Sequence, residues 1–315
     1  MVGRTMLRVL EEEGIVAEYH LFASPAEVGD KVRFAGKDYV IRELSRKAIR
    51  ELKPDFALLA AGGDLSAEYA PIIVKVGGIA IDNSSYFRMH NDVPLVVPEV
   101  NSQVLKKKTG IIANPNCSTI QSVVPLKPLD DAFGLKRVVY STYQAASGAG
   151  INGVADLERG ARGETNKHFT YQLFNNLIPQ IDEFLENGNT KEEEKMILET
   201  KKILGKPELA VTATAVRVPV KNCHSVSINA EFEKPFTLDW ARKILESAPG
   251  VIVVDDTAKK QYPMPILADD RNPVFVGRIR MDESRPNTLN MFVVADNVRK
   301  GAATNAVQIL KFLIT

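Results

Sequence analysis

Residues 55–63 read Asp-Phe-Ala-Leu-Leu-Ala-Ala-Gly-Gly, and this stretch decides the fold class. A short apolar run that ends in two glycines is typical of a buried strand followed by a turn. A helical pattern near Ser66–Val76 comes next, and a second short strand is predicted over Gly78–Ile81. Strands separated by helical segments indicate βαβ units. The sequence therefore predicts a doubly wound α/β region with a mostly parallel sheet.

The flanking segments continue this alternation. Before the stretch we predict a helix over Thr5–Glu13, a strand over Ile15–Phe22 and a hairpin over Lys31–Leu44. After it, Leu95–Val97 and Gly110–Ala113 are predicted strands. The first half of the chain is thus expected to form one layered α/β domain.

The second half has longer strands and fewer alternations. The segments predicted as strands are Arg137–Tyr143, Leu209–Val220, Val226–Phe232, Val251–Val254 and Asn290–Ala295. The segments predicted as helices are Thr190–Leu204, Asp239–Glu246 and Arg299–Ile314. This pattern predicts an α+β region with a mixed sheet.

Composition excludes several classes of protein. The 315 residues include 40 Lys and Arg against 39 Asp and Glu, so the basic surplus of a general nucleic-acid binder is absent. No apolar run approaches the ~20 residues of a membrane span, and the first residues lack a secretory signal pattern. Two cysteines provide neither a disulfide framework nor a zinc-binding pattern, and a reducing cytoplasm is the simplest expectation.

The first chemical signal surrounds Cys117. Residues 113–120 read Ala-Asn-Pro-Asn-Cys-Ser-Thr-Ile, in which a strand ends, an Asn-Pro turn follows and a helix begins near Ser118. Unpaired N–H groups at a helix N-terminus favour a thiolate, so this position predicts a nucleophile. The alternative is an inert buried cysteine that only fills space.

The second signal is residues 217–225, Arg-Val-Pro-Val-Lys-Asn-Cys-His-Ser. We expect a strand that carries Arg217 to lead into a loop that carries His224. Imidazole is the usual partner of a nucleophilic thiol, as a general acid and base. A single histidine is more often structural, but His224 is the best of the four histidines in the chain.

Together these residues belong to a longer pattern. The sequence resembles the bacterial type of aspartate-semialdehyde dehydrogenase over essentially its whole length, through segments 60–63, 84–101, 114–119, 147–157, 184–195, 217–228, 275–282 and 293–309. The resemblance implies a Rossmann-like dinucleotide-binding domain made of residues 1–117 and 297–315. It implies a catalytic and dimerisation domain over residues 118–296, with homodimers as the assembly.

The resemblance also implies roles for individual residues. Cys117 is the expected nucleophile, His224 the general acid and base, and Gln144 the amide that orients the acyl group. Arg217 and Glu192 are expected to contact the aspartyl part of the substrate, and Arg88, Asn116 and Lys195 the phosphate. The expected cofactor-binding residues are Gly3, Ser24, Gly62, Gly63, Ser147, Gly148 and Asn297.

The implied reaction interconverts L-aspartyl-4-phosphate and L-aspartate 4-semialdehyde. It uses NADP and phosphate, passes through a thioester on Cys117 and requires no metal. It serves the biosynthesis of lysine through diaminopimelate, and of threonine, methionine and isoleucine. Partners other than the substrates and a second copy, such as nucleic acid or a membrane, are not expected.

Three departures from the family pattern qualify these expectations. Only Val2-Gly3 remains of the family's first strand and glycine-rich loop, so we expect the natural chain to carry them upstream and the given chain to bind dinucleotide poorly. Ala26 replaces the arginine expected at a 2′-phosphate, and Glu27 adds negative charge, so NAD is a possible cofactor. Cys223 stands where the family usually has glycine.

Two alternatives stay open on the sequence alone. One is a related acyl-phosphate reductase, such as N-acetyl-glutamyl-phosphate reductase or glyceraldehyde-phosphate dehydrogenase, although Arg217 seven residues before His224 argues against both. The other is a truncated paralogue that has lost its cofactor and acts as a dimeric binding partner.

Overall fold

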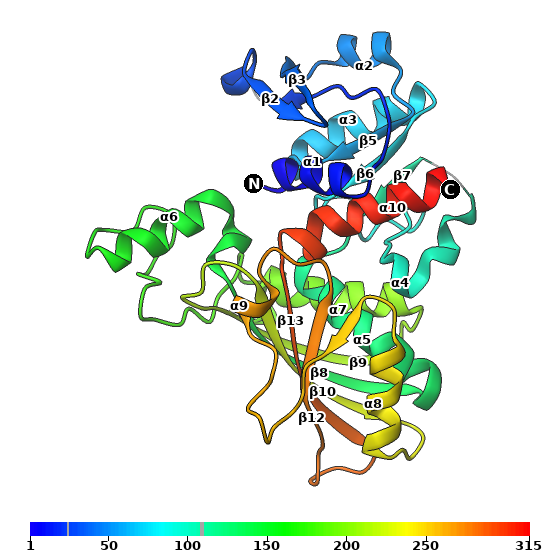
Figure 1. The fold of residues 1–315 in the computed structure, drawn as a ribbon, viewed down its shortest axis with the longest axis vertical. Helices are drawn as coiled ribbons and strands as arrows, with labels where there is room; N and C mark the ends of the chain where they lie inside the picture. Colours follow the sequence, from blue (N-terminus) through cyan, green and yellow to red (C-terminus); the bar gives the residue numbers. More distant parts are fainter. Residues whose placement is uncertain (24, 108–109) are drawn as a thin grey trace. The chain divides into compact units, whose positions relative to one another are not determined.

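The computed structural model describes every residue except Ser24, Lys108 and Thr109, and it divides into two compact units. The N-terminal unit comprises residues 2–98, 102–114 and 303–315. The central unit comprises residues 99–101 and 115–302, with Met1. Figure 1 labels the helices and strands of both units.

The N-terminal unit contains a parallel sheet in the order β5-β6-β7, formed by Phe56–Leu59, Ile79–Asp82 and Ile111–Ala113. A second parallel pair joins β1 (Phe22–Ala23) to β4 (Arg42–Glu43), and an antiparallel pair joins β2 (Lys31–Phe34) to β3 (Lys37–Val40). The helices of this unit are α1 (Val2–Glu12), α2 (Arg46–Leu52), α3 (Gly63–Lys75) and α10 (Thr304–Ile314), with 3₁₀ turns at Pro25–Glu27 and Ser102–Lys107.

Both ends of the chain meet in the core of the N-terminal unit. The helices α1 and α10 contact each other, and their apolar faces bury Met6, Leu10, Ile309 and Leu313. Ile81 of the central strand β6 belongs to the same cluster. Burial of such side chains contributes roughly 1.5–3 kcal/mol each, so the last helix is an integral part of this unit.

Two predicted strands of this unit were wrong. Over Ile15–Phe22, only Phe22 enters a strand, and Val16 is 98% exposed. The physical reason is that a strand needs a hydrogen-bonded neighbour, and the pairing of β1 with β4 extends over Phe22 and Ala23 only. Leu95–Val97 makes one isolated bridge, from Leu95 to Ala113, before α4 (Pro98–Asn101) begins.

The central unit is built on a six-stranded mixed sheet in the order β11-β12-β13-β10-β8-β9. Its strands are β8 (Leu135–Gln144), β9 (Ala210–Arg217), β10 (His224–Phe232), β11 (Val251–Val253), β12 (Val274–Met281) and β13 (Thr288–Ala295). Three helices pack against this sheet: α5 (Cys117–Phe133), α7 (Lys191–Leu204) and α8 (Leu238–Ser247) (Figure 1). Of these, α5 contacts both α7 and α8. The unit also contains α6 (Gly150–Ala161), α9 (Pro265–Ala268) and a 3₁₀ turn at Ala146–Ala149.

The predicted helix over Arg299–Ile314 is two segments rather than one. Residues Arg299–Ala303 form a π-helix, in which the Gly301 N–H donates to the carbonyl oxygen of Asp296 over five residues, and α10 follows. The Asp296 carboxylate caps this segment by accepting from the N–H groups of Val298 and Arg299. The helix was therefore predicted, but its irregular first turn was not.

The predicted fold class is confirmed: an α/β unit with a parallel sheet accompanies an α+β unit with a mixed sheet. No helix in the described part of the chain is long and apolar enough to cross a membrane.

Candidate active site

Cys117 is the first residue of α5, and Asn116 caps this helix. The Asn116 side-chain oxygen accepts hydrogen bonds from the N–H groups of Ser118 at 2.9 Å and Thr119 at 3.2 Å. The Cys117 thiol is partly exposed at this end of the helix, where the peptide dipoles favour negative charge. The predicted helix start near Ser118 lies one residue later than the observed one.

Gly301 of the π-helix packs directly behind Cys117. A Cβ atom added at Gly301 would lie 2.7 Å from the Cys117 Cβ, which is closer than such atoms approach in proteins. The backbone of the π-helix therefore reaches the first turn of α5 only because residue 301 has no side chain. Single π-turns are frequent at functional sites.

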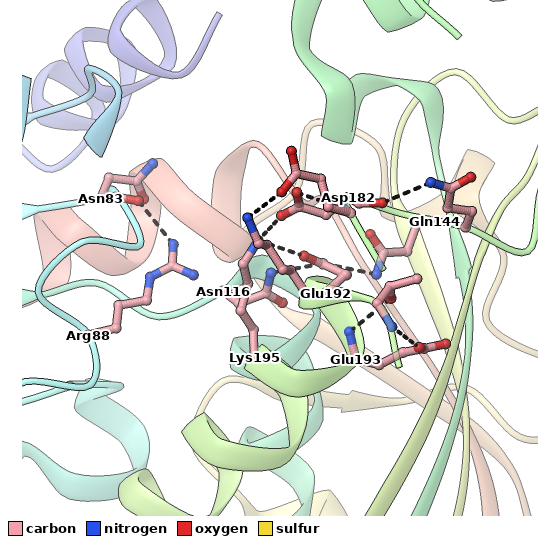
Figure 2. A network of polar contacts seen from close by, with 12 residues as sticks. Asn83, Arg88, Asn116, Gln144, Asp182, Glu192, Glu193 and Lys195 are labelled. Atoms are coloured by element: carbon pink, nitrogen blue, oxygen red, sulfur yellow. Dashed lines mark hydrogen bonds and ion pairs between the residues drawn. The ribbon is translucent and has the colours of Figure 1, made fainter. Parts of the chain in front are cut away.

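Glu192 connects three of the predicted substrate residues, as Figure 2 shows. One of its oxygens, Oε1, accepts from the side-chain amides of Asn116 at 2.8 Å and Gln144 at 3.1 Å. Its other oxygen lies 3.4 Å from the Lys195 ammonium, one helical turn along α7. A capping box made by Thr190 and Glu193 begins this helix and directs Glu192 inward, where it is buried.

Lys195 has a second carboxylate partner that sequence reasoning missed. Asp182, in the loop before α7, places Oδ2 2.8 Å from the Lys195 Nζ (Figure 2). Glu192 and Lys195 are three residues apart in the charged segment 190–195, and this helical spacing indicates that they pair. No such spacing rule relates Asp182 to Lys195.

The backbone of Ala145 contacts both His224 and Arg217. The Ala145 N–H donates to Nδ1 of His224 at 3.0 Å, and the Ala145 carbonyl oxygen accepts from Arg217 Nη1 at 2.8 Å. A Cβ added at Gly148 would lie 2.6 Å from Arg217 Nη1 and 3.0 Å from His224 Nε2. The predicted loop position of His224 was wrong: His224 begins β10, because its backbone pairs with Ala295 of β13.

Burial affects the pKa values of both His224 and Arg217. Burial, and after it the charge of Arg217, lower the pKa of His224 well below its ordinary value. Burial also lowers the pKa of Arg217, while the charges of Glu192 and Cys117 oppose that effect. A guanidinium stays protonated under such shifts, so the site combines a fixed cation with a neutral imidazole.

Cys223 lies beside His224 but in a different environment. Its side chain is fully buried, and burial, followed by the carboxylates of Asp296 and Asp269, raises the pKa of the thiol. These three side chains place possible metal-ligand atoms within 4.8 Å of one another. The Asn222 side-chain amide donates to both carboxylates, so hydrogen bonds connect the members of this cluster.

Ser147 and Asn297, two predicted cofactor residues, meet in the central unit. The Ser147 hydroxyl donates to the Asn297 side-chain oxygen at 3.1 Å, and the Cys223 N–H donates to the same oxygen at 3.0 Å. Within the central unit the structure thus brings together the predicted residues Asn116, Cys117, Gln144, Ser147, Gly148, Glu192, Lys195, Arg217, His224 and Asn297.

The remaining predicted residues belong to the N-terminal unit. Arg88 is buried and donates to the Asn83 carbonyl oxygen at 3.0 Å (Figure 2). Gly3 lies in the first turn of α1, and Gly62 and Gly63 begin α3 after β5. Ser24 lies outside the described residues. Gly62 caps α3 without a side-chain hydrogen bond. Apart from its chain neighbours, no described residue has an atom within 4 Å of the position that a Cβ would take there, which suits a phosphate at the helix N-terminus.

Two protein-family models match the chain. The one described as "Semialdehyde dehydrogenase, NAD binding domain" matches residues 1–108, and the one described as "Semialdehyde dehydrogenase, dimerisation domain" matches residues 126–300. The aspartate-semialdehyde dehydrogenase of Aquifex aeolicus (strain VF5) is 51% identical over 324 residues, which cover 99% of this chain and 95% of that protein. The chain belongs to the aspartate-semialdehyde dehydrogenase family.

Solved structures agree with this membership. The structure of aspartate semialdehyde dehydrogenase II from Vibrio cholerae, complexed with ASA, has a TM-score of 0.93 and 42% identity, covering 99% of this chain and 95% of that one. A Candida albicans aspartate semialdehyde dehydrogenase with NADP has a TM-score of 0.79 and 25% identity, with coverages of 99% and 95%. The chain is therefore an enzyme of this dehydrogenase family, with a domain for a nicotinamide dinucleotide.

Proposed function

We propose that this enzyme reduces L-aspartyl-4-phosphate to L-aspartate 4-semialdehyde with NADPH and releases phosphate, and that it also catalyses the reverse reaction. The observation that carries the proposal is Cys117 at the N-terminus of α5, beside the buried side chains of Arg217, Glu192 and Asn116. The site combines one nucleophile with separate groups suited to a carboxylate and a phosphate.

The substrate groups divide among the residues by charge. Arg217 offers a planar guanidinium to the substrate carboxylate, and Glu192 suits the substrate ammonium. Lys195, Asn116 and Arg88 suit the phosphate. Gln144, whose amide is held by Glu192 at 3.1 Å, orients the acyl group. The ammonium and carboxylate on the α-carbon of the substrate thereby select an aspartyl compound over an acyl phosphate that lacks these two groups.

The reaction needs a covalent intermediate on Cys117. The thiolate attacks the acyl carbon, a C–S bond forms, and the C–O bond to phosphate breaks as phosphate leaves with the electron pair. When bound, the nicotinamide dinucleotide supplies a hydride to that carbon, or accepts one in the reverse direction. The C–S bond then breaks, the sulfur keeps its electron pair, and the aldehyde is free.

The proposed cofactor is NADP, in keeping with the Candida albicans relative. Gly3, Gly62 and Gly63 would line its phosphate-binding side, and Ser147, Gly148 and Asn297 would lie toward the nicotinamide. Ser24 is a further proposed cofactor-binding residue. The N-cap residue of α3 is Gly62, so the first N–H groups of this helix have no capping side chain as acceptor. This supports the binding of a cofactor phosphate there. The proposed dinucleotide-binding domain is residues 1–117 and 297–315, and the catalytic domain is residues 118–296.

We further propose that the enzyme acts as a homodimer in the synthesis of lysine, threonine, methionine and isoleucine. The match of residues 126–300 to a family dimerisation domain supports self-association. Neither nucleic acid nor a membrane is a proposed partner.

The test is a phosphate-dependent assay of aldehyde oxidation with Cys117→Ser and Cys223→Ser as a matched pair. We expect the Cys117 variant to lose turnover by at least about 10³-fold, because a hydroxyl is a far weaker nucleophile. The Cys223 variant should keep turnover within about tenfold. Mass spectrometry should find the acyl adduct on Cys117, and an adduct on Cys223 alone would contradict the assignment.

Substrate preference in this assay and a separate binding titration distinguish the alternative functions. A related acyl-phosphate reductase would prefer N-acetylglutamate semialdehyde or glyceraldehyde 3-phosphate, whereas we expect preference for aspartate semialdehyde. A cofactor-deficient paralogue would show no binding when NADP is titrated into the protein, whereas we expect saturable binding.

A further inference from the structure

Glu199 is a buried carboxylate that the proposed reaction does not use. It lies on α7 among the buried side chains of Met196, Thr200 and Ile203, and 1% of its surface is exposed. About two helical turns separate it from Glu192, so both glutamates project from the same face of the helix. An apolar residue would fill such a position at a lower desolvation cost, so the contacts of this carboxylate must explain its presence.

Glu199 accepts a hydrogen bond from the backbone at the start of α5. The Asn116 N–H donates to Oε2 of Glu199 at 2.6 Å. The Asn116 side-chain amide donates to Oε1 of Glu192 at 2.8 Å (Figure 2). Two carboxylates of α7 thus hold the backbone and the side chain of the residue that immediately precedes Cys117.

Asn116 transmits this constraint to the nucleophile. Its side-chain oxygen caps α5 by accepting from the N–H groups of Ser118 and Thr119, and its carbonyl oxygen accepts from the Ile120 N–H at 2.9 Å. Cys117 is the first residue of this helix and lies between the cap and the residues that it holds. A change in the backbone at Asn116 would therefore displace the thiol.

The hydrogen bond to Glu199 fixes the peptide between Pro115 and Asn116. The proline ring fixes its own φ, so this peptide rotates mainly through ψ of Pro115 and φ of Asn116, which is −59°. Such a rotation would take the buried Asn116 N–H away from Glu199, and a buried donor without an acceptor is unfavourable. The carboxylate thereby opposes the backbone rotation that would displace Cys117.

We infer that Glu199 is a positioning residue for Cys117. As the acceptor for the Asn116 N–H, it keeps the cap of α5 and the thiol in one orientation. The inference rests on the proposed function. Attack on an acyl carbon needs the sulfur in a near-attack position, and a misplacement of about 1 Å can lower turnover about 10²-fold. A contact between Glu199 and the substrate is not part of this role.

The kinetic test compares Glu199→Gln with Glu199→Leu in the full-length enzyme. The two side chains are similar in size, but only the Gln oxygen can accept from the Asn116 N–H. We expect Glu199→Leu to lower kcat about 10–100-fold and Glu199→Gln to keep kcat within about fivefold of wild type. The KM for the aldehyde should change less than about threefold in both variants, because Glu192 keeps its contacts with Gln144 and Lys195.

Thr200→Val is the matched control on the same helix. The Thr200 hydroxyl is buried and forms a hydrogen bond of 3.2 Å with the Tyr140 hydroxyl of β8. Its loss should lower the free energy of unfolding but leave kcat within about twofold of wild type, since Glu199 and Asn116 keep their hydrogen bond. A loss of turnover in Thr200→Val as large as that in Glu199→Leu would overturn the inference, because any weakening of α7 would then have the same effect.

Hydrogen exchange of the Asn116 amide is a readout that does not depend on activity. Carbon-13 at the proline carbonyl and nitrogen-15 in asparagine select the peptides Pro115–Asn116 and Pro286–Asn287, the only Pro-Asn pairs in the sequence. Asn287→Asp assigns the two NMR signals. We expect the Asn116 amide to be protected in wild type and in Glu199→Gln, and to exchange at least about tenfold faster in Glu199→Leu.

Unchanged turnover of Glu199→Leu, or an Asn116 amide that stays protected in this variant, would contradict the positioning role. A Glu199→Gln variant as impaired as Glu199→Leu would also contradict it, because loss of the acceptor would not explain the defect. A failure of the proposed function would look different: Cys117→Ser would then keep its activity, while the exchange result would be unaffected. Circular dichroism confirms that folded proteins are compared, and Glu199→Ala, with the same expected results, replaces Glu199→Leu if that variant does not fold.

Discussion

Cys117 and Cys223 carry the same thiol in opposite electrostatic settings. Cys117 is partly exposed at a helix N-terminus near the Arg217 guanidinium. Cys223 is fully buried near the carboxylates of Asp269 and Asp296, and burial followed by these charges raises the pKa of its thiol. Reactivity follows the thiolate fraction, so the two residues should differ strongly as nucleophiles.

We therefore predict selective alkylation of the native enzyme. Iodoacetamide at neutral pH should label Cys117, with parallel loss of activity, and should leave Cys223 unmodified until the protein is unfolded. Peptide mass spectrometry over time gives both rates. Labelling of Cys223 in the native state at a rate similar to that of Cys117 would contradict this account.

The backbone at Cys223 leads to a stability prediction. Its φ angle is +72°, in the left-handed region that favours glycine. Cys223→Gly should be about 1 kcal/mol more stable than Cys223→Ala, because alanine loses the sulfur but keeps the unfavourable conformation. Urea unfolding of both variants measures the difference. An alanine variant as stable as the glycine variant would show that the left-handed backbone at residue 223 hardly lowers the free energy of unfolding.

At the scale of elements, the segment before α7 is fixed at both ends. Ile178 exchanges two backbone hydrogen bonds with Arg217 at the end of β9, and the Lys191 N–H donates to the Glu183 carbonyl oxygen. Asp182 lies between these anchors with φ +70°, and its carboxylate contacts Lys195 of α7. The loop thus positions a side chain on the following helix.

We predict that Asp182→Asn raises the KM for phosphate about threefold, with a smaller change in the KM for the aldehyde. Asn tolerates the left-handed backbone, so this substitution removes only the charge that holds the Lys195 ammonium. The magnitude is modest because the ion pair is partly exposed.

Glu183→Gln is the matched control for this experiment. It removes a neighbouring carboxylate that pairs with Lys191 instead of Lys195, so the KM for phosphate should not change. A lower KM for phosphate in Asp182→Asn would reverse the interpretation, because it would mean that Asp182 competes with phosphate for Lys195.

A second loop is attached to α6 through one carboxylate. Asp156 is buried and accepts from the N–H groups of Lys167, His168 and Phe169 and from the Arg159 guanidinium. Burial alone would raise the pKa of Asp156, but these hydrogen bonds outweigh it and lower the pKa to about 2. The stabilisation is thus present above the unfolded pKa near 4 and is lost as the pH falls toward 2.

Asp156→Asn should accordingly destabilise the enzyme by about 2 kcal/mol at pH 7, because the amide offers a single acceptor oxygen and no charge. Urea unfolding of wild type and variant between pH 7 and pH 3 provides the test. The difference between them should shrink below pH 4. A constant difference over this range would show that the charge of Asp156 contributes nothing.

At the scale of the whole enzyme, we expect cofactor choice to depend on a short surface segment. Ala26 and Glu27 lie in an exposed 3₁₀ turn after β1. Of the two cations on β2, Lys31 and Arg33, Arg33 is engaged with Asp38 and with the Gly36 carbonyl oxygen. No arginine stands at position 26 to meet a 2′-phosphate, and Glu27 would repel one.

We therefore predict weaker discrimination for NADP over NAD than the family pattern implies. Ala26→Arg should raise the ratio of kcat/KM for NADP to that for NAD about tenfold, through one charge-assisted contact. Kinetics with both cofactors measure this ratio. A strong NADP preference in the unaltered enzyme, without a gain in Ala26→Arg, would contradict the role assigned to position 26.

Local patterns predicted much of this molecule because their causes are local. The apolar run at 56–59, the helical pattern over 190–204 and the turn before Cys117 act within a few residues, and each produced the expected element. The strand over Ile15–Phe22 was wrong because a strand depends on a neighbour that its own sequence does not contain. The loop position of His224 was wrong for the same reason, since pairing with β13 extends β10 to that residue.

The sequence by itself determined the fold class, the family and the position of Cys117 at a helix N-terminus. Only the tertiary structure decided which groups touch: Asp182 with Lys195, Gly301 with Cys117, and the Ala145 backbone with His224 and Arg217. The lowered pKa of His224 belongs to this second class. Burial of the ring and the charge of Arg217 cause it, and both exist only after the strands have assembled.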